Sequence, residues 1–191
     1  MKKLLVIVSV ILVMLIAGTV YAQDAKSYVD LKLGAFYPND KEDDGMAGFD
    51  TGPNLEVDFG YKLNKNFAVE LGLGWYQSKS TEFSDEPTVS AIPIILTAKG
   101  ILPVVDDKIE IFAGAGLGYY MTKAKSEVGL YSVSGNALGW HVVGGADYNI
   151  SKQFALGLEA KWFTVKPEYD ELGFKSDVGG VITNLALKIR F

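Results

Sequence analysis

A single histidine is the residue best suited to catalysis in this sequence. His141 is the only histidine among 191 residues. A histidine that acts as a general base needs a serine or an acidic partner within hydrogen-bond reach, and the spacing along the chain places no such partner beside it. We therefore expect a structural hydrogen bond at His141 and no enzymatic activity, with acyl transfer or proteolysis as the alternative.

The second candidate is an acidic segment that partly matches a calcium-binding loop. Asp40, Glu42, Asp44 and Gly45 fall at the first four defining positions of such a loop. The twelfth position should hold a glutamate that binds calcium through both oxygens, but Thr51 stands there. We therefore expect a solvated acidic loop and no resident metal ion or other cofactor.

The composition narrows the classes of partner. The chain has 18 basic and 23 acidic residues, a formal charge of −5, and no basic tract, so nucleic acid is not an expected partner. Because cysteine is absent, disulfides, thiolate metal sites and lipid-modified cysteine are excluded as well.

The N-terminal segment has the pattern of an export signal. Two lysines precede an apolar run over residues 4–17, and Val20 and Ala22 occupy the positions that a signal peptidase reads. We predict that residues 1–22 are a cleaved signal peptide, with an uncleaved anchor helix as the alternative. The mature chain, residues 23–191, then carries 16 basic and 23 acidic residues and begins outside the cytoplasm.

The elements that position the remaining residues are β-strands. After the leader, apolar and polar residues alternate with period two in eight segments that turn-rich stretches separate. The predicted strands cover residues 27–37, 54–63, 67–77, 89–100, 109–121, 138–149, 154–164 and 180–191. Strands of about eleven residues suit a tilted membrane crossing, and no domain boundary interrupts them.

Each predicted strand has one apolar face and one face that carries its charges. Seven acidic and six basic residues lie on the charged face. They are Asp30, Lys32, Glu56, Asp58, Lys62, Glu70, Lys99, Glu110, Asp147, Glu159, Lys161, Lys188 and Arg190. Such sorting indicates that the two faces of the sheet meet two different media. A soluble lipocalin-like barrel would sort its residues in the same way, but with the apolar face inside and the charged face in water. Parity alone therefore leaves the direction of the two faces open.

Three observations place the charged face inside a membrane barrel. Ten glycines share that face, which weakens strands unless side-chain space is scarce, as it is inside a narrow barrel. Tight connections between the strands alternate with long ones, as the short periplasmic turns and long outer loops of outer-membrane barrels do. Aromatic residues form two girdles at the strand ends, Tyr37, Trp75, Tyr119, Trp140 and Trp162 at one end and Tyr61, Phe67, Tyr148, Phe154 and Phe191 at the other. We predict an all-β, eight-stranded antiparallel up-and-down transmembrane β-barrel with periplasmic termini.

One residue conflicts with regular pairing in this barrel. Pro93 lies within the fourth predicted strand, where it cannot donate a hydrogen bond to the ladder. A closed barrel has no free edge strand to receive it. We therefore expect a bulge or a locally broken ladder at this position.

Glycine and aromatic residues recur in a regular pattern in residues 109–120, 144–160 and 185–191. With this pattern, the three segments resemble the small outer-membrane barrel family that includes OmpW, OmpX and the OmpA membrane domain. Residues 33–38 and the proline in the fourth strand favour the OmpW-like branch. The resemblance implies the outer membrane of a Gram-negative cell and, for that branch, a path by which small hydrophobic molecules leave sideways.

The lumen is expected to hold two kinds of side chain. The nearly balanced charges predict a cross-linked polar interior rather than a wide pore, because buried charges are tolerated only in pairs. An uncharged inward set lies toward the outer end and comprises Phe36, Tyr76, Ile95, Tyr120, Phe163 and Ile182. These six residues could line a hydrophobic pocket above the charges, or fill the barrel as a packed cap.

The last strand ends in a pattern that resembles the signal read by the barrel-insertion machinery. Leu185, Leu187, Ile189 and Phe191 alternate outward up to a terminal aromatic residue. The expected partners are that machinery, outer-membrane lipids including lipopolysaccharide, and a small hydrophobic ligand. We expect a non-enzymatic barrel with a structural or surface role, with binding or passage of small hydrophobic molecules as the finer hypothesis. A lipid-modifying acyltransferase and a soluble secreted carrier are the alternatives.

Overall fold

The computed structural model describes residues 26–39, 48–80, 87–125, 132–169, 174–175 and 178–191. The predicted signal peptide and most of the acidic loop lie outside these ranges. The ten strands within them are β1 (Ser27–Pro38), β2 (Gly52–Asn64), β3 (Phe67–Lys79), β4 (Thr88–Val104), β5 (Ile109–Lys125), β6 (Ser132–Asn149), β7 (Phe154–Val165), β8 (Glu168–Tyr169), β9 (Phe174–Lys175) and β10 (Gly180–Arg190). In the described part of the chain, no helix is long and apolar enough to cross a membrane.

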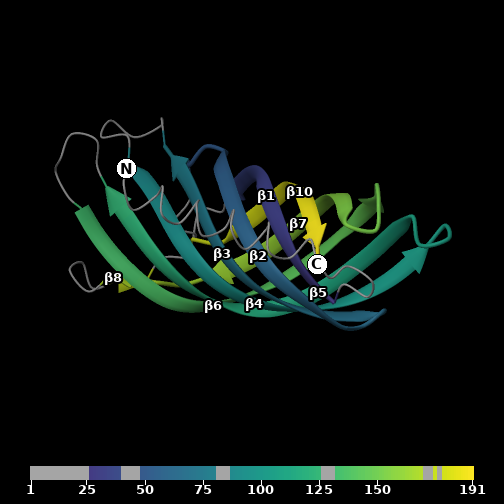
Figure 1. Ribbon diagram of the computed structural model, residues 1–191. Helices are drawn as coiled ribbons and strands as arrows, with labels where there is room; N and C mark the ends of the chain where they lie inside the picture. The colour runs from purple at the N-terminus through teal and green to yellow at the C-terminus, as the bar shows by residue number, and fades with distance from the viewer. Residues whose placement is uncertain (1–25, 40–47, 81–86, 126–131, 170–173, 176–177) are drawn as a thin grey trace, which may run out of the picture.

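Eight of the strands close into an antiparallel barrel. Strands β1 to β7 pair in chain order, and β10 closes the ring by pairing with both β7 and β1. Figure 1 shows these strands side by side along the tilted wall. Closure pairs the backbone groups of every strand, as a bilayer core without water requires. The predicted fold class is therefore confirmed.

The strands of one side of the barrel are longer than the alternation predicts. Strands β4, β5 and β6 have 17, 17 and 18 residues, and the ladder between β5 and β6 continues to the pair Lys125↔Ser132. The outward face is polar there, as at the paired residues Lys123 and Ser134, so the alternation of apolar outward and polar inward residues ends although pairing continues. The short β8 and β9 pair with each other, and β8 also pairs with β6.

The expected irregularity at Pro93 is present as a gap in one ladder. Strands β3 and β4 pair at Leu73↔Ile94 and again at Tyr76↔Ala91, without the two bridges between them. The register is the same on both sides of the gap, so the structure has a broken ladder and no bulge. On its other side, β4 pairs with β5 without interruption.

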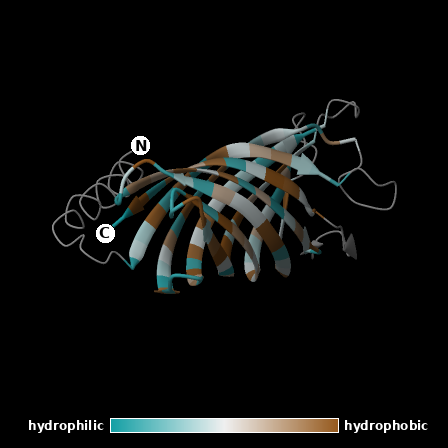
Figure 2. Ribbon diagram, turned by 90° about the vertical axis from the view of Figure 1, so that its right-hand side faces the viewer, coloured by the Kyte–Doolittle hydropathy of each residue, from teal (hydrophilic) through white to brown (hydrophobic). Residues whose placement is uncertain are grey.

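The two faces of the wall point as predicted. Leucines such as Leu71 and Leu158 are 55% and 64% exposed on the outer surface, whereas the charges of the other face are buried, apart from the half-buried Lys62. Figure 2 shows the alternation as successive bands of hydropathy along the ribbons. The exposed apolar surface is the one that meets lipid.

Inward glycines make room for large side chains from neighbouring strands. A Cβ atom at Gly60 would collide with the ring of Tyr28, and one at Gly116 would collide with the ring of His141. Lumen space is therefore the limiting quantity in this barrel, which explains why glycine is tolerated in its strands.

Candidate functional site in the barrel lumen

The outer half of the lumen is filled by an aromatic cluster. Phe36, Tyr76, Tyr120 and Phe163 come from β1, β3, β5 and β7 and meet near the barrel axis. Their ring centroids are 4.4 Å apart for Phe36 and Tyr76 and 5.4 Å apart for the stacked pair Tyr120 and Phe163. All four side chains are buried. We call this group, with Ile95 and Ile182, the outer cluster.

The outer cluster unites all six residues that the sequence placed in a hydrophobic pocket or cap. The same buried group also contains Val89, Ala91, Val165 and Val178. Val89 and Ala91 share the inward parity of Ile95 on β4, so their pattern was available in the sequence. Val178 precedes β10 and belongs to no strand, so periodicity gave no signal for it. Ligand binding by the outer cluster stays a prediction.

An uncharged polar layer follows on the periplasmic side of the outer cluster. The Asn54 amide donates to Asn184 Oδ1 at 2.8 Å. His141 is buried, and its Nε2 lies 2.9 Å from Thr97 Oγ1. The hydrogen-bond partner of His141 is thus a threonine hydroxyl rather than a serine or a carboxylate. The sequence pattern did not single out Asn54, Thr97 and Asn184 as site residues, although each has inward parity.

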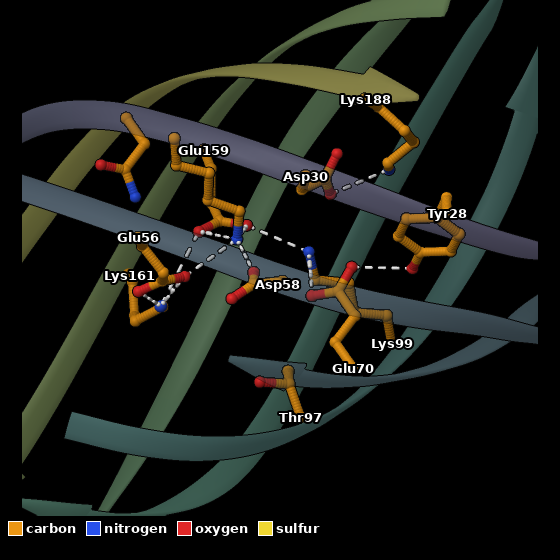
Figure 3. A network of polar contacts seen from close by, with 12 residues as sticks. Tyr28, Asp30, Glu56, Asp58, Glu70, Thr97, Lys99, Glu159, Lys161 and Lys188 are labelled. Atoms are coloured by element: carbon orange, nitrogen blue, oxygen red, sulfur yellow. Dashed lines mark hydrogen bonds and ion pairs between the residues drawn. The ribbon is translucent and has the colours of Figure 1, made fainter. Parts of the chain in front are cut away.

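Below this layer, lysines and carboxylates from five strands form a central ion-pair network (Figure 3). Lys32 Nζ lies 3.0 Å from Glu56 and 2.8 Å from Glu159, and it also pairs with Asp58. Lys99 pairs with both Glu159 and Glu70, and Lys161 pairs with Glu56. Every one of these side chains is at least 97% buried. Such charges are tolerated because each is paired.

The network continues to the periplasmic mouth. Lys188 pairs with Asp30 and Asp147. The Tyr28 hydroxyl donates to Glu70 at 2.7 Å, which connects an aromatic ring below the network to its charges. At the mouth, Glu110 pairs with Lys62 at 2.7 Å and with Arg190 at 3.3 Å. The structure thus brings all thirteen charges that parity placed inside into ion pairs.

The described part of the chain contains no candidate metal site. Across the described ranges, no group of three or more His, Asp or Glu side chains is arranged to hold a metal ion. Asp40, Glu42, Asp44 and Gly45 lie outside those ranges.

The candidate assembly signal at the C-terminal end lies on the outer face of the barrel, where Leu185 of β10 is 65% exposed. The ring centroids of Phe191 and Phe59 are 6.3 Å apart. Recognition of this pattern by insertion machinery stays a prediction.

The comparison with protein families decides the identity of this barrel. The model described as an outer membrane protein beta-barrel domain matches residues 8–181. The chain belongs to this family. Its members' location, the outer membrane of Gram-negative cells, follows for this barrel. No curated protein matches the sequence.

Solved structures with the same fold have low sequence identity to this family member. Neisserial surface protein A is 14% identical with a TM-score of 0.65, covering 87% of this chain and 98% of its own. OprG from Pseudomonas aeruginosa is 15% identical with a TM-score of 0.57, covering 87% and 96%. The N-terminal barrel domain of OprF from the same organism is 13% identical with a TM-score of 0.51, covering 87% and 98%. These likenesses establish the fold, and the narrower OmpW-like assignment stays a prediction.

Proposed function

We propose that this protein is a closed, non-enzymatic outer-membrane barrel with a structural or surface role. The observation that carries the proposal is that side chains fill the lumen at successive levels. The outer cluster occupies the outer half, and buried ion pairs occupy the centre. An eight-stranded barrel has an interior just wide enough for such side chains.

The filled lumen argues against ion conduction. A passing ion would have to separate buried pairs such as Lys32 and Glu159 and displace the stacked rings of Tyr120 and Phe163. Removing one partner from a buried pair typically costs several kcal/mol. Seven acidic and six basic inward groups also provide little net charge to select either ion sign.

Conductance measurements test the closed-barrel function. Purified protein inserted into planar lipid bilayers is expected to give no stable conductance steps, because both filled levels block the axis. A large porin inserted into the same bilayers serves as the positive control. Reproducible steps that scale with the amount of inserted barrel would show an open pore and contradict the proposal.

The finer proposal is that small hydrophobic molecules bind at the outer cluster. Its support is the gap between β3 and β4, which lies beside two members of the cluster, Tyr76 and Ile95. Separation of the two strands at this gap would connect the cluster with the bilayer. The charges below would stop an apolar molecule, since desolvating them for an apolar ligand returns no compensating interaction.

Fluorescence quenching tests this finer proposal. A small hydrophobic quencher is expected to reduce the emission of Trp75, which lies at the ladder gap, in a saturable way. The double variant Tyr120→Lys, Phe163→Lys should abolish saturation because it places charges in the cluster. Tyr119→Lys is the matched control, since Tyr119 is 44% exposed on the opposite face of the same strand. If quenching is not saturable in the wild type, or if it saturates equally in the double variant, the finer proposal is wrong and the outer cluster is a packed structural cap.

A further inference from the structure

The periplasmic mouth of the lumen is a cavity lined mainly by charged and polar residues. Its volume is about 770 Å³, which lies in the usual range for sites that hold small molecules. Among its lining residues, six are basic and two are acidic. The basic residues are Lys26, Lys62, Lys65, Lys108, Lys152 and Arg190. We call this cavity the mouth basin.

The lysines of the mouth basin come from separate segments of the chain. Each of the three periplasmic turns contributes one, with Lys65 between β2 and β3, Lys108 between β4 and β5, and Lys152 between β6 and β7. Lys26 directly precedes β1. A cleft lined by charges of one sign focuses their field. Positive potential is thus concentrated at one end of a chain whose formal charge is −5.

Within the described ranges, four of these lysines have no ion-pair partner. They are exposed and comprise Lys26, Lys65, Lys108 and Lys152. The other two basic residues, Lys62 and Arg190, share Glu110. Asp106 and the C-terminal carboxylate of Phe191 lie at the same end outside the lining. Counting them gives four acidic groups against six basic ones, so an excess of positive charge remains.

Arg190 supplies an independent observation that points to an anion. Its side chain lines the mouth basin and is only 8% exposed. Its Nη2 donates to Asn149 at 2.7 Å and to Glu110 at 3.3 Å. Its buried Nε–H, however, has no acceptor in the described part of the chain. A buried donor without an acceptor is unfavourable, and an anionic oxygen bound in the basin would satisfy it.

The mouth basin is separated from the rest of the lumen by apolar side chains. Tyr28 and Phe112 are buried members of one cluster. They lie two residues further into the barrel than Lys26 and Glu110, respectively. A charged ligand would lose hydration among these rings without gaining a partner. Binding therefore ends at the mouth and involves no passage along the barrel axis.

The direction and charge of the mouth basin define the class of ligand. Lys26, Lys62 and Arg190 share the inward parity of their strands, so they face the barrel axis rather than the bilayer. A ligand thus enters from the periplasm. Four unpaired lysines around one cavity favour several anionic groups in one molecule, since linked groups bind more tightly than separate ones. We propose that the mouth basin binds a water-soluble periplasmic compound that carries several anionic groups.

Arg190 provides a specific signal for this binding because it is the only arginine in the sequence. Its Nε–H therefore gives one identifiable resonance in the ¹⁵N NMR spectrum of the protein in zwitterionic detergent micelles. Inorganic tripolyphosphate should shift this resonance in a saturable way. Orthophosphate, which has a single anionic group, should bind at least about tenfold more weakly. Equal affinity for the two probes, or an Arg190 signal that tripolyphosphate leaves unchanged, would overturn the proposal.

Two matched double variants test where the probe binds. Lys65→Gln, Lys152→Gln removes two exposed turn lysines and should weaken tripolyphosphate binding about tenfold, because each charge in contact contributes about fivefold even in water. Lys123→Gln, Lys125→Gln removes two exposed lysines at the outer end of β5. It should change the affinity less than twofold, since the membrane thickness exceeds the screening length. Equal losses in both variants would show a response to net charge alone and overturn the proposal.

Phosphatidylglycerol tests the other source of anionic groups, the headgroup of a membrane lipid. Added to the micelles, it should leave the Arg190 resonance in place, because the mouth basin opens along the barrel axis. Tripolyphosphate should still produce the saturable shift in these mixed micelles. A saturable shift produced by phosphatidylglycerol itself would overturn the proposal of a soluble ligand and assign the mouth basin to lipid headgroups.

Discussion

Lys32→Met is expected to lower the free energy of unfolding by about 3–5 kcal/mol, the range for a buried ion pair that loses one partner. The Lys32 ammonium group lies among three carboxylates, those of Glu56, Asp58 and Glu159. Methionine has a similar length but no charge, so it leaves the carboxylates with two neighbouring lysines instead of three. Reversible denaturant unfolding in lipid vesicles provides the measurement.

Two further variants separate lost pairing from lost packing. Asp58 has Lys32 as its ion-pair partner in the described network, so Lys32→Met, Asp58→Asn removes the lysine together with one negative charge. This double variant should recover part of the lost stability. Lys26→Met, at an exposed position, should change the unfolding free energy by less than about 0.5 kcal/mol. A double variant less stable than Lys32→Met would contradict the ion-pair explanation.

Leu71→Arg is expected to lower the unfolding free energy by about 2–4 kcal/mol, the cost of an arginine near the bilayer midplane on a barrel surface. Leu71 is 55% exposed on the outer face of β3, between Phe59 and Leu96 of the adjacent strands. An arginine there has to lie in hydrocarbon or thin the bilayer locally. The same vesicle unfolding assay measures the effect, and Leu158→Arg on another part of the wall should act similarly.

Depth in the membrane is the control for this second prediction. Leu63 is also outward and 58% exposed, but it lies one residue before the end of β2, at the periplasmic turn. Leu63→Arg should therefore cost about 0–1 kcal/mol, as charges near the interface do. Similar losses for Leu63→Arg and Leu71→Arg would show that the substitution disturbs the strand itself rather than its contact with lipid.

The amino-acid sequence by itself determined the strands, their two faces and the content of the lumen. Alternation with period two is a local property, because neighbouring residues of a strand point to opposite faces. It therefore identified all eight barrel strands, the lipid-facing leucines and the thirteen inward charges. Pro93 predicted either a bulge or a broken ladder for a similarly local reason, since a residue without a backbone N–H cannot donate to its neighbour. Local signals failed where the outward face becomes polar, as at the paired residues Lys125 and Ser132.

Only the tertiary structure decided which residues meet. Lys32 and Glu159 are 127 residues apart in the chain, and Glu56 and Lys161 are 105 apart. Parity assigns each residue to a face but not to a height in the barrel. Height depends on strand register and on the stagger required for closure. The same registers unite the outer cluster, because its members come from strands whose relative positions are set by the closed barrel as a whole.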